Sequence, residues 1–178
     1  IEWFCDFQAN LSKQERIPLT DQVEGIEMLY SSGTTGMPKG ILKPMPKGAF
    51  GIPSEGYKLT AKIYGFDEET VYLSPAPQYH AAPLLFSLRA LRFGATVLIM
   101  EKFDAETSLA LIERYKVTHS QWVPTMFIRL LQLREDARRS YNLSTLRCVI
   151  HAAAPCPIEI KQQMLDWWGP IIWEYYGG

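Results

Sequence analysis

Short candidate strands alternate with helical patterns through the second half of the chain. The candidates are 71–74, 95–100, 118–123, 146–151 and 171–175; most of them are apolar, and each contains β-branched or aromatic residues. They begin about 25 residues apart, which is the spacing of βαβ units in a parallel sheet. The sequence therefore predicts an α/β fold with a mostly parallel sheet.

Two of the intervening segments carry helix signals at their ends. Apolar residues recur with helical spacing through 104–116, behind Asp104 as a predicted N-cap. The segment 157–169 has Pro157 at its first helical position and Gly169 just past its end. Both segments are predicted to be helices that cover the sheet with one apolar face.

The first seventy residues are less regular. We predict a peripheral irregular segment over 1–25 and a single domain over 26–178. Within that domain, 26–31 and 40–43 read as extended stretches. The segment 48–64 is expected to contain a helix whose start is weakened by Gly51, Pro53 and Gly56.

The loop between the two extended stretches is the most informative segment. It reads Tyr-Ser-Ser-Gly-Thr-Thr-Gly-Met-Pro-Lys-Gly over 30–40. Two glycines let backbone N–H groups turn inward around an anion, and the hydroxyls add donors for phosphate oxygens. Lys39 supplies a positive charge for a polyphosphate. The loop lacks the G-x-x-x-x-G-K-[ST] order of a Walker A motif, and an exposed polar hairpin is the structural alternative.

The segment 28–40 resembles the phosphate-loop signature of the adenylate-forming (AMP-binding) superfamily. The segments 75–83 and 121–125 are most similar to fatty acyl-CoA synthetases. The resemblance implies that the chain is part of the large N-terminal domain of such an enzyme. It also implies a nucleotide site built from Ser31, Ser32, Gly33, Thr34, Thr35, Gly36, Lys39, Ala152, Ala153, Ala154, Pro155, Tyr175, Tyr176 and Gly177.

Small residues at a strand tip let a flat ring approach the backbone, and an aromatic ring stacks on adenine, so 152–155 and Tyr176 are the adenine candidates. Ala152 stands where the family more commonly has glycine, which predicts a different backbone angle there. The resemblance gives catalytic roles to Thr35, Lys39 and His80, and acyl contacts to His80, Trp122 and Thr125.

Each of these strand-end residues also has a structural alternative. His80 suits a helix start, and Trp122 suits a core. His151 is compatible with either a core or a ligand-facing position. His119, inside a predicted strand, is expected to be structural.

Composition narrows the function classes. The net charge is −1, and no block of like charges suggests a nucleic-acid or membrane surface. The three cysteines, Cys5, Cys148 and Cys156, show no C-x-x-C spacing, which argues against a disulfide framework or a zinc site. A reducing, cytoplasmic compartment is expected. No run of apolar residues is long enough for a transmembrane helix.

The implied reaction uses ATP, Mg²⁺ and coenzyme A to convert a carboxylic acid, expected to be a fatty acid, into an acyl-adenylate and then a thioester. The Glu that would ligate Mg²⁺ and the C-terminal domain are expected beyond Gly178, so the chain alone is predicted to be inactive and to contain no metal site. Three alternatives stay open: a non-catalytic nucleotide- or phosphate-binding module, an adenylating enzyme with another acceptor, and an aromatic acid substrate.

Overall fold

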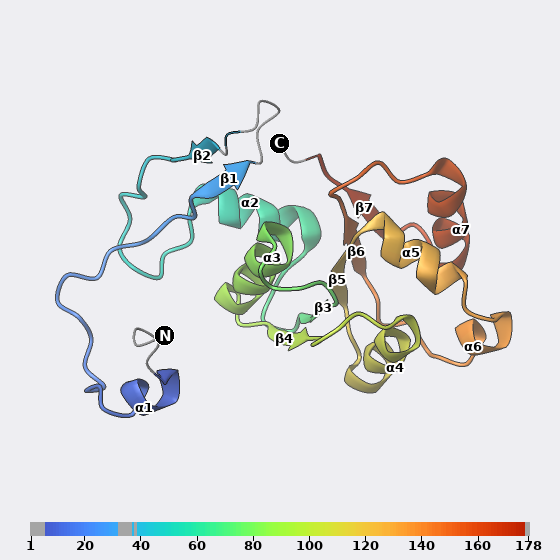
Figure 1. Cartoon of the computed structure of the whole chain (residues 1–178), viewed down its shortest axis with the longest axis horizontal. Coiled ribbons are helices and arrows are strands. Elements are labelled where there is room, and N and C mark those ends of the chain that lie inside the picture. Colours follow the sequence, from blue (N-terminus) through green and yellow to red (C-terminus); the bar gives the residue numbers. More distant parts are fainter. Residues whose placement is uncertain (1–5, 32–36, 38, 177–178) are drawn as a thin grey trace. The chain divides into compact units, whose positions relative to one another are not determined.

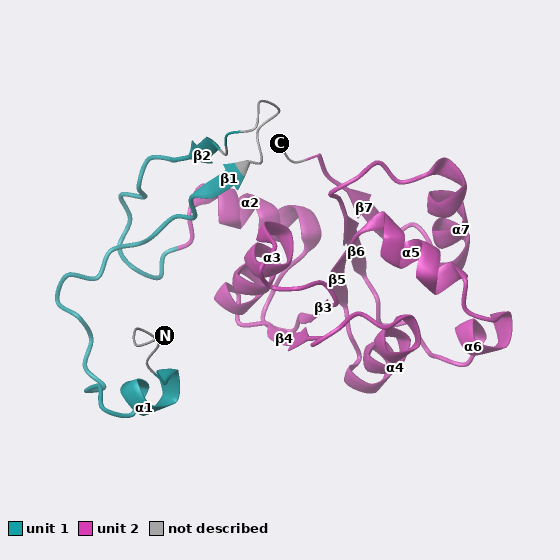
Figure 2. Ribbon diagram, viewed as in Figure 1, with its two compact units in different colours: residues 1–52 teal, residues 53–178 magenta. Residues whose placement is uncertain are grey.

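The computed structural model describes residues 6–31, 37 and 39–176. The chain divides into two compact units, residues 1–52 and 53–178 (Figure 2). The predicted boundary at residue 25 falls inside the first of these units.

The first unit contains few regular elements: α1 (Phe7–Leu11), β1 (Leu29–Ser31) and β2 (Lys39–Ile41). The Asp6 side chain begins α1 by accepting a hydrogen bond from the Ala9 N–H at 2.7 Å. β1 and β2 pair antiparallel as a hairpin. Both strands are shorter than the extended stretches expected from the sequence, because the flanking residues make no ladder pairs.

The second unit is built on a five-stranded, all-parallel sheet with strand order β4-β3-β5-β6-β7 (Figure 1). The α/β prediction is confirmed. All five predicted strands are present. The first has the predicted bounds and the other four are shorter than predicted: β3 (Val71–Ser74), β4 (Thr96–Ile99), β5 (His119–Trp122), β6 (Cys148–His151) and β7 (Ile172–Glu174).

Helices cover both faces of the sheet (Figure 1). One face carries α2 and α3, and the other carries α4, α5 and α7. No described helix has the length and apolar character needed to cross a membrane. The helix bounds are α2 (Glu55–Tyr64), α3 (Ala81–Arg92), α4 (Ala105–Tyr115), α5 (Pro124–Leu131), α6 (Glu135–Arg139) and α7 (Ile158–Trp168).

Strand alternation creates the two cores. Tyr72 and Leu73 are adjacent in β3 and fully buried, yet they belong to different hydrophobic clusters. Successive side chains of a strand point to opposite faces, so one central strand supplies both cores. The larger cluster lies against α4, α5 and α7 and includes Leu109, Phe127 and Trp168.

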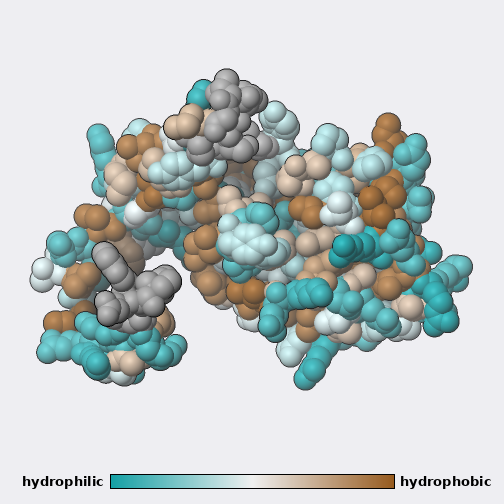
Figure 3. All heavy atoms as spheres, in the orientation of Figure 1, coloured by the Kyte–Doolittle hydropathy of each residue, from teal (hydrophilic) through white to brown (hydrophobic). Residues whose placement is uncertain are grey.

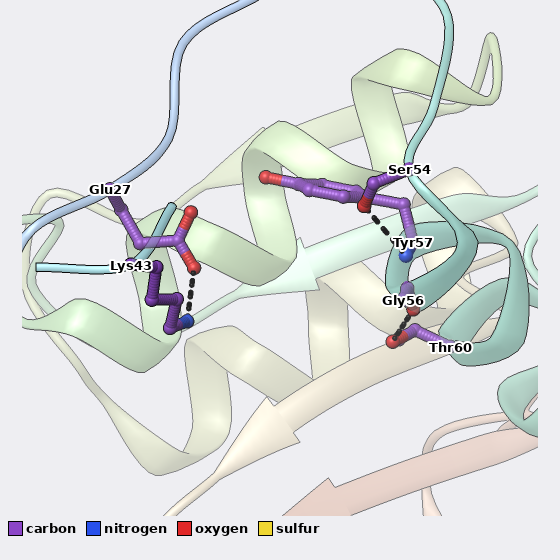
Figure 4. Close-up of polar contacts among 6 residues, drawn as sticks. All are labelled: Glu27, Lys43, Ser54, Gly56, Tyr57 and Thr60. Atoms are coloured by element: carbon purple, nitrogen blue, oxygen red, sulfur yellow. Dashed lines mark hydrogen bonds and ion pairs between the residues drawn. The ribbon is translucent and has the colours of Figure 1, made fainter. Parts of the chain in front are cut away.

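Helix ends follow the local chemistry that the sequence indicates. Asp104 caps α4 by accepting from the Thr107 N–H at 2.8 Å. The Ser54 hydroxyl accepts from the Tyr57 N–H at the start of α2 (Figure 4). The start of α2 at Glu55 agrees with the expected disruption by the glycine and proline before it. Pro157 differs from the expectation by one position, since it is the N-cap of α7 and not its first helical residue.

His119 is structural, as predicted, and Cys148 is also a buried core residue. The His119 ring is buried, with one nitrogen 2.8 Å from the Tyr64 carbonyl oxygen and the other 2.8 Å from the Thr118 hydroxyl. It stacks on Phe66 with ring centroids 4.9 Å apart. Burial raises the pKa of the Cys148 thiol to about 12, which keeps it an inert core thiol.

Candidate functional site

The β1–β2 hairpin carries the ends of the predicted phosphate loop. Ser31 pairs with Lys39 as the last register position before the turn. Lys39 is exposed, as is every residue of β2. The hairpin therefore presents the Lys39 ammonium group to solvent at the mouth of the turn. The remaining predicted loop residues lie outside the described part of the chain: Ser32, Gly33, Thr34, Thr35, Gly36 and Pro38.

Gly40 allows the hairpin strands to pack closely. It pairs with Tyr30, and a Cβ at position 40 would lie 3.1 Å from the Tyr30 ring and 2.4 Å from the Met28 methyl carbon. A side chain there would push both neighbours aside. The glycine after Lys39 thus has a packing reason for its place beside the loop.

Two polar contacts hold the chain that leads into and out of the hairpin. The Glu24 carboxylate, which is buried, accepts from the Gly51 N–H at 3.0 Å. Glu27 and Lys43 form an ion pair at 3.2 Å (Figure 4). Both contacts join the segment before β1 to the segment after β2, so they close the hairpin at its base.

The carboxyl end of β3 leads into a tight turn that places His80. The buried Ser74 hydroxyl accepts from the Gln78 side-chain amide at 2.7 Å. His80 is the N-cap of α3 by backbone position, but its side chain makes no capping hydrogen bond. The exposed imidazole lies 4.6 Å from the Tyr79 ring. The ring is therefore available to a ligand, and a pure capping role is not supported. The contact of Gln78 with Ser74 was not predicted from the sequence. The only local signal for it is that Gln78 follows the polar residue at the strand end by four positions.

Trp122 lies in the core, which differs from its predicted contact with the acyl group. Its side chain is 0% exposed, and its indole N–H donates to the Ser120 hydroxyl at 2.5 Å. The Trp168 ring packs edge-on against it at 5.6 Å. Because its side chain has no exposed surface, Trp122 stabilises the strand end by packing in the core. Thr125, in the first turn of α5, is exposed and keeps its predicted position open to a substrate.

His151, whose position the sequence left open, belongs to the core. It is 0% exposed at the end of β6, and its ring meets Phe127 edge-on at 5.4 Å. Neither ring nitrogen has a hydrogen-bond partner among the described residues. Burial lowers the pKa of His151, an effect that the positive charge of Lys161 reinforces. The imidazole is therefore neutral at neutral pH.

The backbone after β6 is left-handed at Ala153, with φ of 78°. The unusual backbone angle was predicted for Ala152, which does not have a positive φ. Ala152 is buried, and its N–H donates to the Trp122 carbonyl oxygen and so extends the β5–β6 pairing. Ala153, Ala154 and Pro155 are exposed. The turn leaves a small, open backbone surface at the strand tip, which suits the close approach of a flat ring.

The end of β7 presents two tyrosines in different environments. Tyr175 is half-buried, and its ring packs 5.8 Å from Phe86 while its N–H donates to the His151 carbonyl oxygen. Burial raises the pKa of its phenol. Tyr176 is 99% exposed, so its ring is open to stacking. Glu174 pairs with Lys161 of α7 and fixes the strand end to that helix. Gly177 lies outside the described residues.

The carboxyl ends of the parallel strands lie on one edge of the sheet, where α/β folds bind ligands. His80, the 153–155 turn and Tyr176 all follow such ends within the second unit. Within the described ranges, no group of three His, Cys, Asp or Glu side chains could hold a metal ion. His80, the 153–155 turn and Tyr176 supply no carboxylate, so they do not by themselves offer the charged oxygen ligands that Mg²⁺ prefers.

Comparison with known proteins agrees with this architecture. The family model described as "AMP-binding enzyme" matches residues 7–178. A putative acyl-CoA synthetase, YngI of Bacillus subtilis (strain 168), is 32% identical over 154 residues, which are 86% of this chain and 27% of that protein. The 2-succinylbenzoate–CoA ligase of Bacillus pumilus (strain SAFR-032) is 30% identical over 168 residues, 94% of this chain and 32% of that protein.

A solved structure shows the same likeness in three dimensions. The o-succinylbenzoate coenzyme A synthetase of Bacillus subtilis in complex with AMP is 27% identical, with a TM-score of 0.65 over 82% of this chain and 28% of that one. The chain thus spans about a third or less of the relatives it matches. With nearly its whole length matched by the family model, the chain belongs to the AMP-binding enzyme family.

Proposed function

We propose that the protein is an ATP-dependent acyl-CoA synthetase. In the first half-reaction, a carboxylate oxygen of the acid attacks the α-phosphorus of ATP, and pyrophosphate leaves. In the second, the coenzyme A sulfur attacks the acyl carbon, its proton is lost, and AMP leaves. Family membership and relatives named as CoA ligases support this reaction class.

The observation that carries the proposal is the register of the hairpin. Ser31 opposite Lys39 closes a turn whose sequence holds two glycines and three further hydroxyls. Such a turn offers N–H and O–H donors around an anion, with one ammonium group at its exit. Thr34, Thr35 and Lys39 are proposed to hold the β- and γ-phosphates, where fixed donors stabilise the charge that develops on the leaving pyrophosphate.

The strand ends of the second unit are proposed to hold the organic parts of the substrates. The open backbone of Ala153 and Ala154 suits an adenine edge, and the Tyr176 ring suits stacking on it. His80 and Thr125, both exposed at helix starts, are proposed to flank the acyl group. A fatty acid is the proposed substrate class, from the likeness of 75–83 and 121–125 to fatty acyl-CoA synthetases.

ATP binding by the hairpin is tested with a lysine pair. Lys39→Met should weaken ATP affinity of the 178-residue chain by roughly tenfold or more, because it removes the charge facing the phosphates. Lys47→Met removes an equal charge from another exposed site of the first unit and should leave affinity unchanged. Isothermal titration measures both. An equal loss of ATP affinity in the two variants would show that the effect comes from the change in net charge. It would refute the phosphate-binding role of Lys39.

Catalysis is tested by ATP–pyrophosphate exchange. The 178-residue chain, which spans about a third or less of the relatives it matches, is expected to show no exchange with any acid. A longer chain that matches its relatives over their whole length should catalyse the exchange. The exchange rate should be higher with fatty acids than with benzoate-type acids. Exchange catalysed by the 178-residue chain alone would contradict the expectation that this chain is inactive by itself.

A further inference from the structure

A surface pocket of about 290 Å³ lies between α6 and α7 in the second unit. It is formed where α6 approaches the last turns of α7, whereas the nucleotide and acyl candidates follow the carboxyl ends of the strands. In Figure 3, hydrophilic residues gather at the lower right, where Figure 1 places α6. The pocket is lined by Glu135, Arg138, Arg139, Gln163, Asp166 and Trp167.

Arg138 and Trp167 form the organised part of the pocket. The Arg138 guanidinium carbon lies 5.5 Å from the centre of the Trp167 ring, a cation–π contact that holds the side chain in place. Arg138 is half-buried, and its Nε is enclosed without a hydrogen-bond partner among the described residues. Because the Nε is enclosed, the donors that Arg138 offers to the pocket are its terminal guanidinium nitrogens, which the contact with Trp167 helps to position.

The carboxylates near Arg138 contact other side chains. Glu135 pairs with Arg139, and Asp136 pairs with Arg134 at 3.2 Å. The Asp166 carboxylate accepts from the Gln162 amide at 2.9 Å. Arg138 is thus left without an anionic partner in the described part of the chain.

The chemistry of the lining limits the class of ligand. A guanidinium fork matches the two oxygens of a carboxylate, and the adjacent indole offers an apolar surface. Glu135 and Asp166 also line the pocket, and their charges would repel the several charges of a polyphosphate more strongly than the single charge of a monocarboxylate. We propose that the α6–α7 pocket binds a small monocarboxylate with an apolar or aromatic body, at a site separate from the nucleotide and acyl candidates.

The test follows the indole resonance of Trp167 during titration of the 178-residue chain with benzoate. A Trp167→Phe variant identifies the resonance, and sodium chloride of equal ionic strength corrects for screening. Benzoate should shift the Trp167 signal saturably. Inorganic phosphate, with a higher charge and no apolar body, should bind more weakly at the same place. A benzoate response confined to other tryptophans, or tighter binding of phosphate, would overturn the proposal.

Arginine variants complete the experiment. Arg138→Gln should weaken benzoate binding roughly tenfold to a hundredfold, because it removes a charged donor to the carboxylate. Arg138→Lys keeps the charge and loses the fork, so it should fall between the parent and Arg138→Gln and remain informative if the glutamine variant folds poorly. Arg134→Gln removes an equal charge next to α6, outside the pocket lining, and should bind like the parent. Unchanged affinity in Arg138→Gln would refute the site.

Discussion

The β1–β2 hairpin and the parallel sheet place their residues in opposite environments. All four residues of β5 and all four of β6 are buried, whereas each residue of β2 is exposed. The strands of the sheet derive their stability from packing on two faces, and the hairpin rests on its own ladder and a few polar contacts. The comparison indicates that Lys39, which is proposed to bind phosphate, contributes little to stability. The buried strand residues contribute to binding only by holding the strand ends in place.

The largest effect is expected from Trp122→Ala. It removes a fully buried ring from the larger core and leaves the Ser120 hydroxyl without its donor, so the free energy of unfolding should fall by about 3–5 kcal/mol. Urea unfolding followed by circular dichroism measures it. Trp173→Ala, at a ring that is 46% exposed, serves as the control and should cost clearly less. Equal losses would contradict the assignment of Trp122 to the core.

A pH effect should follow from the two buried histidines. Burial lowers the pKa of both His119 and His151 in the folded chain, while the unfolded chain has the ordinary value near 6.5. Below that value the unfolded state binds more protons, so stability is fully present above about pH 6.5 and is lost as the pH falls through the folded pKa values. Urea unfolding at a series of pH values measures the loss.

The variant His151→Leu separates the two histidines. It removes a buried imidazole whose nitrogens have no partner among the described residues, so the acid-side loss should be smaller than in the parent. An unchanged pH profile would show that His151 does not titrate with folding.

A smaller effect is expected at the start of α4. Asp104→Ala removes the acceptor of the Thr107 N–H and should cost about 1 kcal/mol of unfolding free energy. Asp104→Asn keeps a capping oxygen and should lie close to the parent in the same urea assay. A loss as large in Asp104→Asn as in Asp104→Ala would assign the effect to charge and not to the cap.

The smallest stability effect is expected in the hairpin. Lys39→Met should change the unfolding free energy by no more than about 0.5 kcal/mol, because the side chain is exposed. Thermal unfolding of the variant used for ATP titration provides the measurement. A large destabilisation would mean that Lys39 is structural, and the contrast between hairpin and sheet would fail.

The sheet was predictable because its strands recur about 25 residues apart and contain β-branched or aromatic residues. β3 and β6 are also largely buried, whereas β4 and β7, at the two edges of the sheet, are partly exposed. The helices α3 and α5 were not predicted. In α3, Leu84, Leu88 and Leu91 are exposed beside a buried face, so apolar residues occur all round and blur the helical period. α5 follows β5 after a single residue, which merges the two patterns into one apolar stretch.

The strand ends were harder to interpret than the strands. Trp122 follows Ser120 by two residues, and strand alternation places both on the face of the larger core. The two-residue period of the strand identifies the face that is buried. A bulky residue at the end of a strand, considered without that period, is easily interpreted as part of a pocket wall. For His151 the sequence could not distinguish core from site, because its position depends on how α5 and α7 pack over the end of β6.

Ala153 holds a backbone conformation that costs an L-residue about 1–2 kcal/mol and costs glycine almost nothing. A saturation library at position 153, sorted by yield of folded protein, should thus enrich glycine first and asparagine next, and deplete valine and isoleucine. Adenosine affinity need not follow the same ranking. A more flexible turn is less preorganised, so it loses more conformational entropy when it binds the adenine ring. Selection for abundance and selection for ligand retention would then choose different amino acids at one position.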